Sequence, residues 1–205
     1  MRKLPSSLIA VCLSATSAFG QANDRPTITE ALGQLQSHYA SLADFSADFS
    51  HTYSGGVLSA SDTEFGTVRV KKPGRWRFDY REPEQKIFIC DGFSIHSYFP
   101  ADSRVIVSQL PPDGGASTPA LFLAGKGDLR RDFTAKFLEP PSPNDRVWWI
   151  IQLTPTRTDA DYEQLTLTID PQSLTIQQMA TTDFQGGIST YTFSNLMENR
   201  GLSDT

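Results

Sequence analysis

The 205-residue sequence is 39% hydrophobic and 20% charged, which is the composition of one globular domain large enough to bury its own core. Its formal net charge is −5 and no block of like charge runs along it, so the composition excludes a basic nucleic-acid-binding protein. No segment recurs at a fixed period, which excludes a solenoid.

The N-terminal segment predicts a secretory signal peptide. A positive region at residues 2–3 precedes an apolar stretch at residues 4–19, and Ala18 and Gly20 have the spacing of a cleavage site. The apolar stretch is too short and too polar to span a bilayer. We therefore expect removal of the first 20 residues (1–20), which leaves residues 21–205 as one periplasmic domain.

The first element of the mature chain is the one long helix that the pattern predicts, over residues 27–42. Thr27 and Glu30 have the spacing of a capping box. Apolar residues recur on one face at helical spacing, at Ile28, Ala31, Leu32, Leu35, Tyr39 and Leu42. This stripe predicts that the helix packs against an apolar surface of the same domain.

Most of the remaining chain alternates with period two, as half-buried antiparallel strands do. The alternation is clearest at residues 76–80, where three aromatic residues share one face. Asp91 and Gly92 lie between two apolar runs and predict a hairpin with a two-residue turn. We expect strands at residues 44–53, 63–71, 76–80, 87–90, 93–99, 105–110, 133–139, 147–154, 163–170, 174–183 and 187–195.

One apolar segment interrupts the predicted sheet. Thr118 and Pro119 indicate the start of a short helix and Gly125 its end, with only Ala, Leu and Phe between them. A further helical turn is expected at residues 128–131. Glycine- and proline-rich stretches flank this short apolar helix on both sides.

Together these elements predict a mainly β fold. A long antiparallel sheet curls into an incomplete, half-open barrel, with one long N-terminal helix and one or two short helices. The pattern alone leaves two interpretations open. Either the helices fill the curled sheet, or a cavity remains that holds an apolar ligand.

No arrangement of residues in the sequence indicates catalysis, a metal or a cofactor. His38, His51 and His96 are scattered and lack metal-ligand spacing. No nucleophile elbow, zinc-protease or phosphate-binding motif occurs. Cys90, the one cysteine left after signal cleavage, lies in an apolar run and is expected in the core. We therefore predict a binding protein rather than an enzyme.

A series of short segments follows the N-terminal helix in a characteristic order. They are FSADF at 45–49, GTVRVKKP at 66–73, WRFDY at 76–80, ICDG at 89–92 and YFP at 98–100, followed by 153–155, 165–170 and 183–199. Their order and spacing resemble those of the outer-membrane lipoprotein carrier proteins, the LolA family. The resemblance covers essentially the whole mature chain and rests on no single unique motif.

The resemblance implies a periplasmic carrier for acylated lipoproteins. Such a carrier receives its client from an inner-membrane ABC-type release complex, shields the acyl chains inside the incomplete barrel and passes the client to an outer-membrane receptor. It implies an incomplete barrel around an apolar cavity that is closed by a helical lid, here residues 118–125. It also implies a monomer that needs no cofactor. Three other classes stay open: a related half-barrel protein that carries a glycolipid, a periplasmic sensor of the same fold, and an unrecognised periplasmic hydrolase.

The resemblance also implies which residues form the site. A basic residue before the proline of the second segment holds the lid shut, and here it is Lys72. Arg is usual at this position, and Lys lacks its planar fork, so we expect a weaker latch. The resemblance further implies that an aromatic residue shortly after this position lines the cavity, and here it is Trp76. The strand and helix patterns add the rest of the expected lining of the lipid-binding cavity: Tyr39, Phe49, Val68, Val70, Phe78, Tyr80, Phe88, Leu121, Phe122 and Leu123.

The C-terminus departs from the family pattern. After Leu202 the family usually adds a further strand, whereas this chain stops at Thr205. The resemblance therefore implies that the final C-terminal strand is missing or that the chain is incomplete. A missing strand would leave an edge of the sheet unpaired.

Overall fold

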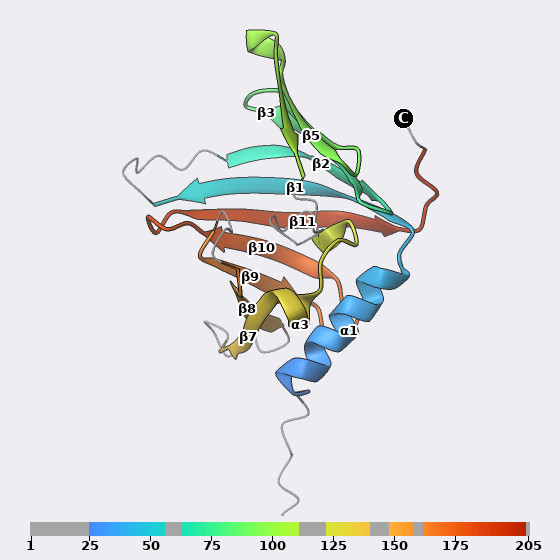
Figure 1. Ribbon diagram of the computed structural model, residues 1–205, viewed down its shortest axis with the longest axis vertical. Coiled ribbons are helices and arrows are strands. Elements are labelled where there is room, and N and C mark those ends of the chain that lie inside the picture. The colour runs from blue at the N-terminus through green and yellow to red at the C-terminus, as the bar shows by residue number, and fades with distance from the viewer. Residues whose placement is uncertain (1–24, 56–62, 111–121, 140–147, 158–161, 204–205) are drawn as a thin grey trace, which may run out of the picture.

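The computed structural model describes residues 25–55, 63–110, 122–139, 148–157 and 162–203. The predicted signal peptide and the predicted helix start at Thr118 lie outside these residues. Within them, one antiparallel sheet of 11 strands carries two α-helices (Figure 1). The helices are α1 (Ile28–Ser41) and α3 (Leu129–Asp132), and a 3-10 turn covers Pro100–Asp102. The strands are β1 (Asp44–Ser54), β2 (Thr63–Lys71), β3 (Arg75–Glu82), β4 (Lys86–Cys90), β5 (Ser94–Phe99), β6 (Arg104–Gln109), β7 (Phe133–Leu138), β8 (Trp149–Pro155), β9 (Gln164–Ile169), β10 (Ile176–Thr182) and β11 (Ile188–Glu198).

Helix α1 begins as its sequence predicts. The hydroxyl of Thr27 accepts a hydrogen bond from the Glu30 N–H at 3.3 Å, and the Glu30 carboxylate accepts one from the Thr27 N–H at 2.9 Å. This reciprocal capping box satisfies two N–H groups that the first turn leaves without helical partners. The apolar stripe is buried at Ala31, Leu32, Leu35 and Tyr39, so the predicted packing face is confirmed.

The strand order is β6-β5-β4-β3-β2-β1-β11-β10-β9-β8-β7, with every neighbouring pair antiparallel. Strands β1 to β6 run outward to one edge, and β7 to β11 return from the other edge to the centre. Pairing between β1 and β11 is therefore the seam that joins the two halves. The edge strands β6 and β7 are not paired with each other, so the predicted mainly β fold with an unclosed sheet is confirmed.

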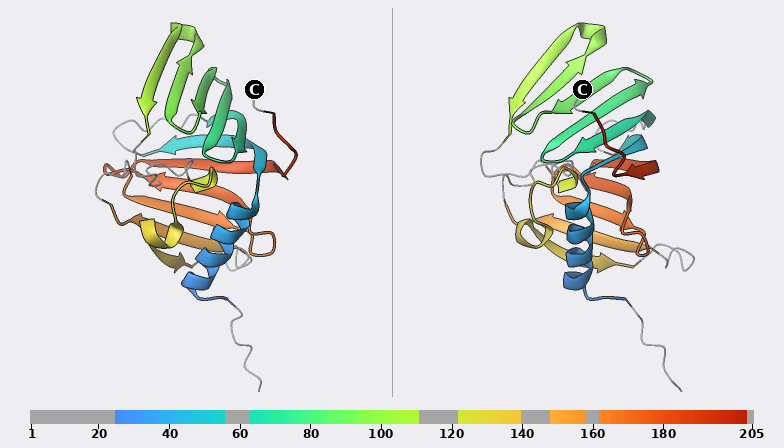
Figure 2. Two further views of the ribbon diagram at one scale, coloured as in Figure 1. Left: turned by 45° about the vertical axis from the view of Figure 1, so that its right-hand side comes forward. Right: turned by 90° about the vertical axis from the view of Figure 1, so that its right-hand side faces the viewer.

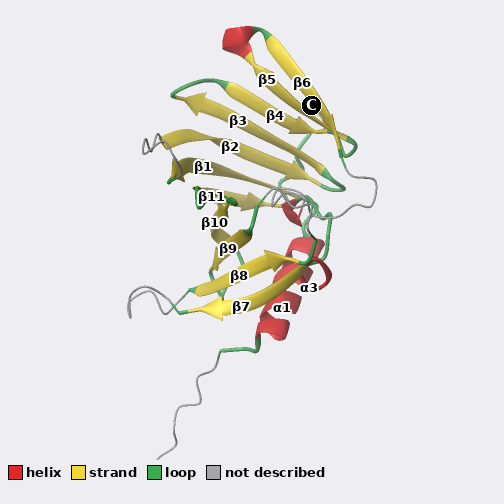
Figure 3. Cartoon of the chain, turned by 60° about the vertical axis from the view of Figure 1, so that its left-hand side comes forward, coloured by secondary structure: helices red, strands yellow, loops and turns green. Residues whose placement is uncertain are grey.

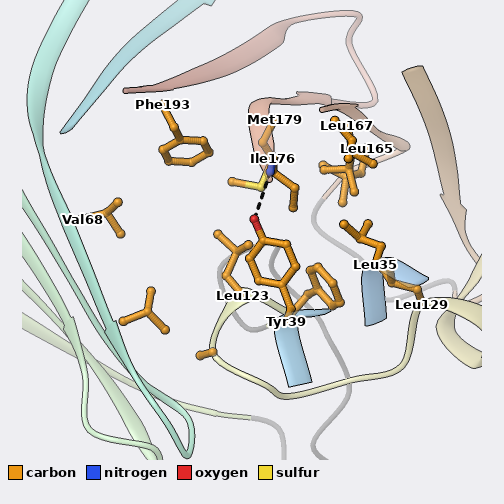
Figure 4. Close-up of a cluster of buried hydrophobic side chains, with 14 of the residues drawn as sticks. Leu35, Tyr39, Val68, Leu123, Leu129, Leu165, Leu167, Ile176, Met179 and Phe193 are labelled. Carbon is orange, nitrogen blue, oxygen red and sulfur yellow. Dashed lines mark hydrogen bonds between the residues drawn. The ribbon is translucent and has the colours of Figure 1, made fainter. Parts of the chain in front are cut away.

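The helices cover one half of the sheet. Both lie against β7 to β11, and strands β3 to β6 extend beyond them (Figures 1 and 2). Figure 3 shows α1 and α3 on the inner side of the bent sheet. Between them and the sheet lies a core in which Leu35 of α1 and Leu165 and Leu167 of β9 are fully buried (Figure 4). The half beyond the helices is where an inner face remains available for a ligand.

The hairpin between β4 and β5 forms where it was predicted, but its turn lies one residue later than expected. Cys90 pairs with Ile95, and the N–H of Asp91 donates to the carbonyl oxygen of Ser94 at 3.2 Å, so Gly92 and Phe93 form the turn. The Asp91 carboxylate accepts hydrogen bonds from the N–H groups of Phe93 at 2.8 Å and Ser94 at 2.7 Å. These bonds stabilise the turn, in which Gly92 takes a positive φ, of 102°.

A buried carboxylate anchors the segment that follows β11. Asp44 is only 4% exposed, and its side chain accepts hydrogen bonds from the backbone N–H groups of Arg200, Gly201 and Leu202 at 2.9, 3.0 and 3.3 Å. The Lys71 ammonium donates to the carbonyl oxygen of Leu202. Asp44 thereby ties the C-terminal segment to the start of β1.

Replacing Asp44 by Ala is expected to lower the free energy of unfolding by about 2 kcal/mol, because several N–H groups lose a charged acceptor at once. Urea denaturation followed by circular dichroism measures the change. Asp48→Ala is the matched control, since Asp48 accepts a single surface hydrogen bond, from Asn195 at 2.7 Å, and should cost less than about 0.5 kcal/mol. Equal losses in the two variants would contradict the anchoring role.

Candidate functional site

A pocket of about 390 Å³ lies on the inner face of the sheet, across the β1–β11 seam. One wall comes from β1 to β5 and the other from β10 and β11. Its volume is within the range of roughly 300–1,000 Å³ that is usual for small-molecule sites. Apolar side chains form much of the lining: Trp76, Phe78, Phe88, Ile95 and Met179. Polar side chains complete it: His51, Glu64, Tyr80, Lys86, Thr181, Ser189 and Tyr191.

Strand β3 builds the aromatic wall of this pocket. Trp76, Phe78 and Tyr80 alternate with polar residues and are buried, as period two predicts. On the other face of the strand, Asp79 forms ion pairs, including one at 2.7 Å with Arg77. Edge-to-face and tilted contacts join the rings, with 5.6 Å between the centroids of Trp76 and Phe78. The wall is thus a rigid apolar surface whose polar counterpart faces away from the pocket.

The structure divides the predicted cavity residues into two groups. The first group lines the pocket: Trp76, Phe78, Tyr80 and Phe88. The second is buried but does not line it: Tyr39, Phe49, Val68, Val70, Phe122 and Leu123. Leu121 lies outside the described residues. The helix and strand patterns therefore predict which of these side chains are buried without separating pocket from core.

Tyr39 shows why an inner-face residue can belong to the core. The pairing of β9 with β10 shifts register between Ile176 and Gln178. The hydroxyl of Tyr39 accepts a hydrogen bond from the N–H of Ile176 at 3.0 Å (Figure 4), and burial raises the pKa of Tyr39. Its ring also lies 5.7 Å from that of Phe122. Tyr39 therefore joins α1, the sheet and the described end of the predicted lid.

Lys72 lies beside the predicted lid, but no described residue accepts a hydrogen bond from its ammonium group. The Nζ atom is buried, and burial lowers the pKa of Lys72. The stem of Lys72 packs against Gly125 so closely that a Cβ added to this glycine would lie 3.2 Å from Cδ and Cε. Residues 111–121 are outside the described part of the chain, so a hydrogen-bonded latch stays a prediction.

The pocket contains a set of hydrogen-bonded side chains that the sequence did not predict. We call them the polar cluster: His51, Glu64, Tyr80, Lys86, Ser189 and Tyr191. Nδ1 of His51 lies 3.2 Å from Glu64 Oε2 and 3.2 Å from the hydroxyl of Tyr80. Nε2 of His51 lies 2.7 Å from Oγ of Ser189. The hydroxyls of Tyr80 and Tyr191 are 2.6 Å apart, and the imidazole of His51 stacks on the ring of Tyr191 at 4.1 Å. The second oxygen of Glu64 accepts from the Lys86 ammonium.

Burial shapes the titration of this cluster. It lowers the pKa of His51 from the ordinary value of 6.5, although the carboxylate of Glu64 opposes the shift. It also raises the pKa of both Tyr80 and Tyr191. Near neutral pH the imidazole and both phenols are therefore uncharged, while Glu64 and Lys86 form an ion pair with each other.

The depressed pKa of His51 makes stability depend on pH. Below about pH 6.5 the unfolded chain binds a proton at His51 more readily than the folded chain does. The contribution of His51 to the free energy of unfolding is therefore complete above this pH and is lost as the pH falls. We expect the free energy of unfolding, measured by urea denaturation, to fall more between pH 7.5 and pH 5.5 for the wild type than for His51→Gln. The difference should reach a limiting slope of about 1.4 kcal/mol per pH unit. His96→Gln, which changes a more exposed side chain, should keep the wild-type dependence. An identical pH dependence in His51→Gln would contradict the prediction.

A second pocket, of about 250 Å³, lies beside the C-terminal segment at Leu202 and Ser203. Its lining includes four basic residues, Arg69, Lys71, Arg75 and Arg77. Such a charged lining does not suit an acyl chain, because apolar burial there would also desolvate charges. The pocket across the β1–β11 seam is therefore the candidate functional site.

The described residues contain no group of three or more His, Cys, Asp or Glu side chains that could hold a metal ion. Cys90 is free and buried, and its thiol donates to the carbonyl oxygen of Gly74 at 3.3 Å. Burial raises the pKa of Cys90, which makes it a poor nucleophile. None of the described helices is long and apolar enough to cross a membrane.

Comparisons with known proteins agree with one another. The family model described as outer membrane lipoprotein carrier protein LolA matches residues 40–205. The outer-membrane lipoprotein carrier protein of Nitrosospira multiformis is 26% identical over 86% of this chain and 82% of its own length. That of Cupriavidus pinatubonensis is 27% identical over 95% of this chain and 89% of its own length. Among solved structures, a DUF1329 family protein from Desulfovibrio piger has a TM-score of 0.51 at 12% identity over 86% of this chain and 95% of that chain, a likeness of fold alone.

Proposed function

Because this chain belongs to the LolA family of outer membrane lipoprotein carrier proteins, we propose that it carries lipoproteins by enclosing their acyl chains in the pocket across the β1–β11 seam. The observation that carries the proposal is the apolar wall of this pocket, formed by Trp76, Phe78 and Phe88 and faced by Met179. This wall lies in the half of the sheet that the helices leave uncovered (Figure 2). A ligand there would lie against the aromatic side chains of the pocket lining.

The physical need for such a pocket follows from the client. Each methylene group of an acyl chain gains about 0.8 kcal/mol when it leaves water. A lipoprotein anchor with two or three acyl chains therefore does not stay free in an aqueous compartment. A carrier has to cover the chains during transfer between two membranes.

The carrier must also release its client, and the packed interior offers a way to limit affinity. Phe122 and Leu123 are buried, and the ring of Phe122 contacts Tyr39. We propose that long acyl chains displace this apolar segment, and that the lost packing weakens net binding enough for hand-off. Lys72, whose stem packs on Gly125, is the proposed latch of the same segment.

The route that fits this function begins with export through the predicted signal peptide. In the periplasm the carrier would accept lipoproteins from an ABC-type release complex of the inner membrane. It would then pass them to a receptor in the outer membrane. The match to the LolA family supports this route, and the proposed chemistry of the carrier is binding alone, without catalysis or cofactor.

Release of a radiolabelled lipoprotein from spheroplasts tests the proposal. The spheroplasts come from cells depleted of their own carrier, and the purified mature protein is added outside. We expect the lipoprotein to appear in the supernatant as a complex with the added protein. An equal amount of an unrelated periplasmic protein is the control. Equal release in both samples would overturn the proposed function.

A further inference from the structure

The candidate pocket combines a dry apolar wall with hydrogen-bonded polar side chains, a combination that an acyl chain alone does not use. We propose that the polar cluster is a subsite for a neutral hydrogen-bond acceptor, the ester carbonyl oxygen at the root of the client's acyl chains. The subsite would thereby recognise the linkage to glycerol while the apolar wall covers the hydrocarbon. This inference rests on the proposed carrier function and assigns a part of the anchor to each wall of the pocket.

Charge balance indicates a neutral ligand group. Lys86 is the one cation among the described lining residues of this pocket, and its ammonium group pairs with Glu64 and lies 4.8 Å above the ring of Tyr80. His51 carries no charge near neutral pH, because burial lowers its pKa. A phosphate or carboxylate would find no unpaired positive charge here, and burying it would be costly. An ester carbonyl carries no such penalty.

A count of protons shows that the cluster has a donor to spare. The carboxylate of Glu64 can only accept hydrogen bonds, and its Oε2 lies 3.2 Å from Nδ1 of His51. It therefore favours the tautomer of His51 that carries the proton on Nδ1. Nε2 of His51 then accepts from the hydroxyl of Ser189 at 2.7 Å. Tyr80 and Tyr191 share one hydrogen bond of 2.6 Å. Each tyrosine hydroxyl has one proton, so one of the two is left without an acceptor in the cluster.

Geometry favours the hydroxyl of Tyr191 as the free donor. Tyr80 lies between His51 and Tyr191, at 3.2 Å from Nδ1 and 2.6 Å from the other hydroxyl. When Nδ1 bears the proton, the oxygen of Tyr80 faces that N–H and its own proton points to Tyr191. The proton of Tyr191 then has no acceptor among the described residues of the cluster. Tyr191 is only partly exposed, and a donor in such a position favours a ligand that brings an acceptor.

A second donor in the same pocket supports this reading independently. The indole Nε1 of Trp76 is buried and has no hydrogen-bond partner in the described structure, although Trp76 is only 7% exposed. Leaving such an N–H unpaired costs free energy, and a ligand acceptor would recover it. The pocket thus has hydrogen-bond donors without partners, whereas its charged groups are paired. A neutral carbonyl group, which accepts hydrogen bonds and carries no charge, fits both properties.

A pair of matched lipopeptides tests the subsite. One is a synthetic cysteinyl peptide whose thioether-linked glycerol bears two palmitoyl esters, and the other bears the same two chains as hexadecyl ethers without the carbonyl oxygens. Their affinities for the purified mature protein follow from displacement of an apolar fluorescent dye. We expect the wild type to prefer the ester peptide roughly tenfold. In Tyr191→Phe we expect this preference to fall close to one, with the affinity for the ether peptide unchanged.

Tyr53→Phe is the matched control, since the hydroxyl of Tyr53 donates to Asp183 rather than to the polar cluster. It should keep the tenfold preference. An infrared measurement covers the case in which Tyr191→Phe does not fold. The stretch of a ¹³C-labelled ester carbonyl should lie at lower frequency in the wild-type complex than in an alkane solvent, because a hydrogen bond weakens the C=O bond.

The outcomes separate the subsite from the carrier function. If neither peptide binds the wild type, the proposed function fails and the subsite with it. If both peptides bind equally well, the pocket holds acyl chains but the carbonyl subsite is overturned. The subsite is also overturned if Tyr191→Phe weakens both peptides alike, because the hydroxyl then only braces the strands. An unshifted carbonyl stretch overturns it as well.

Discussion

Replacing Thr181 by Trp is expected to weaken binding of an acylated peptide roughly a hundredfold while the protein stays folded. Thr181 lines the pocket from β10 and pairs with Ser189 of β11 in the sheet. An indole at this position would occupy space that about four methylene groups of the ligand could fill. At about 0.8 kcal/mol for each methylene, the loss is about 3 kcal/mol, or roughly two orders of magnitude in Kd. Dye displacement by the ester peptide measures it.

Thr192→Trp supplies the control for this change. Thr192 lies on β11 next to Tyr191, and its side chain is exposed. Because neighbouring residues of a strand point to opposite faces, a tryptophan there enlarges the surface without entering the pocket. We expect its affinity to match that of the wild type. Retained binding in Thr181→Trp, with a melting temperature like that of the wild type, would place the acyl chains elsewhere.

Replacing Gly66 by Ala is expected to have the largest effect on stability, a loss of at least about 3 kcal/mol. Gly66 pairs with Phe49 of β1 and with Tyr80 of β3. A Cβ at this position would collide with the carbonyl oxygen of Asp79 and lie 2.6 Å from Cζ of Phe49. A backbone oxygen cannot move aside without breaking the β2–β3 pairing, so the cost reaches the upper end of that for overpacked cores. Chemical denaturation measures the loss.

Gly33→Ala is the matched control, with an expected effect of opposite sign. Gly33 lies within α1, and a Cβ added there would meet nothing closer than a guanidinium nitrogen of Arg130 at 4.0 Å. Alanine in a helix interior should stabilise the protein by about 0.5–1 kcal/mol. If Gly66→Ala unfolds at the same urea concentration as the wild type, β2 does not approach Phe49 and β3 as closely as described.

Local patterns in the sequence were sufficient to predict the elements of this fold. The capping box at Thr27 and Glu30 marks the helix start, and the alternation around Trp76 and Phe78 assigns a buried face to β3. Both signals come from residues close together in the chain. The predicted position of the β4–β5 turn was one residue too early, because the carboxylate of Asp91 bonds to backbone N–H groups that propensity rules do not count.

The pocket itself could be predicted only in part. Helical spacing places Tyr39 toward the interior and period two places Val68 and Trp76 there, but only tertiary packing decides which of them meets a cavity. Tyr39 accepts a hydrogen bond in the core from the N–H of Ile176, next to a register shift between β9 and β10. No pattern in the sequence predicts this register shift. The polar cluster was missed for a related reason. His51 and Ser189 lie 138 positions apart in the chain and meet only because β11 pairs with β1.

The position of the β1–β11 seam also affects the stage of synthesis at which the pocket can form. The pocket takes one wall from β1 to β5 and the other from β10 and β11, so a chain that emerges N-terminus first has half a site until its final strand arrives. Aromatic residues of β3 would then be exposed without the hydroxyls that complete the cluster. A complete pocket therefore forms only after β10 and β11 have been synthesised. If the chain carries acyl chains as proposed, it gains this capacity only at that stage, and an unfinished chain would have little means of extracting lipid from a membrane.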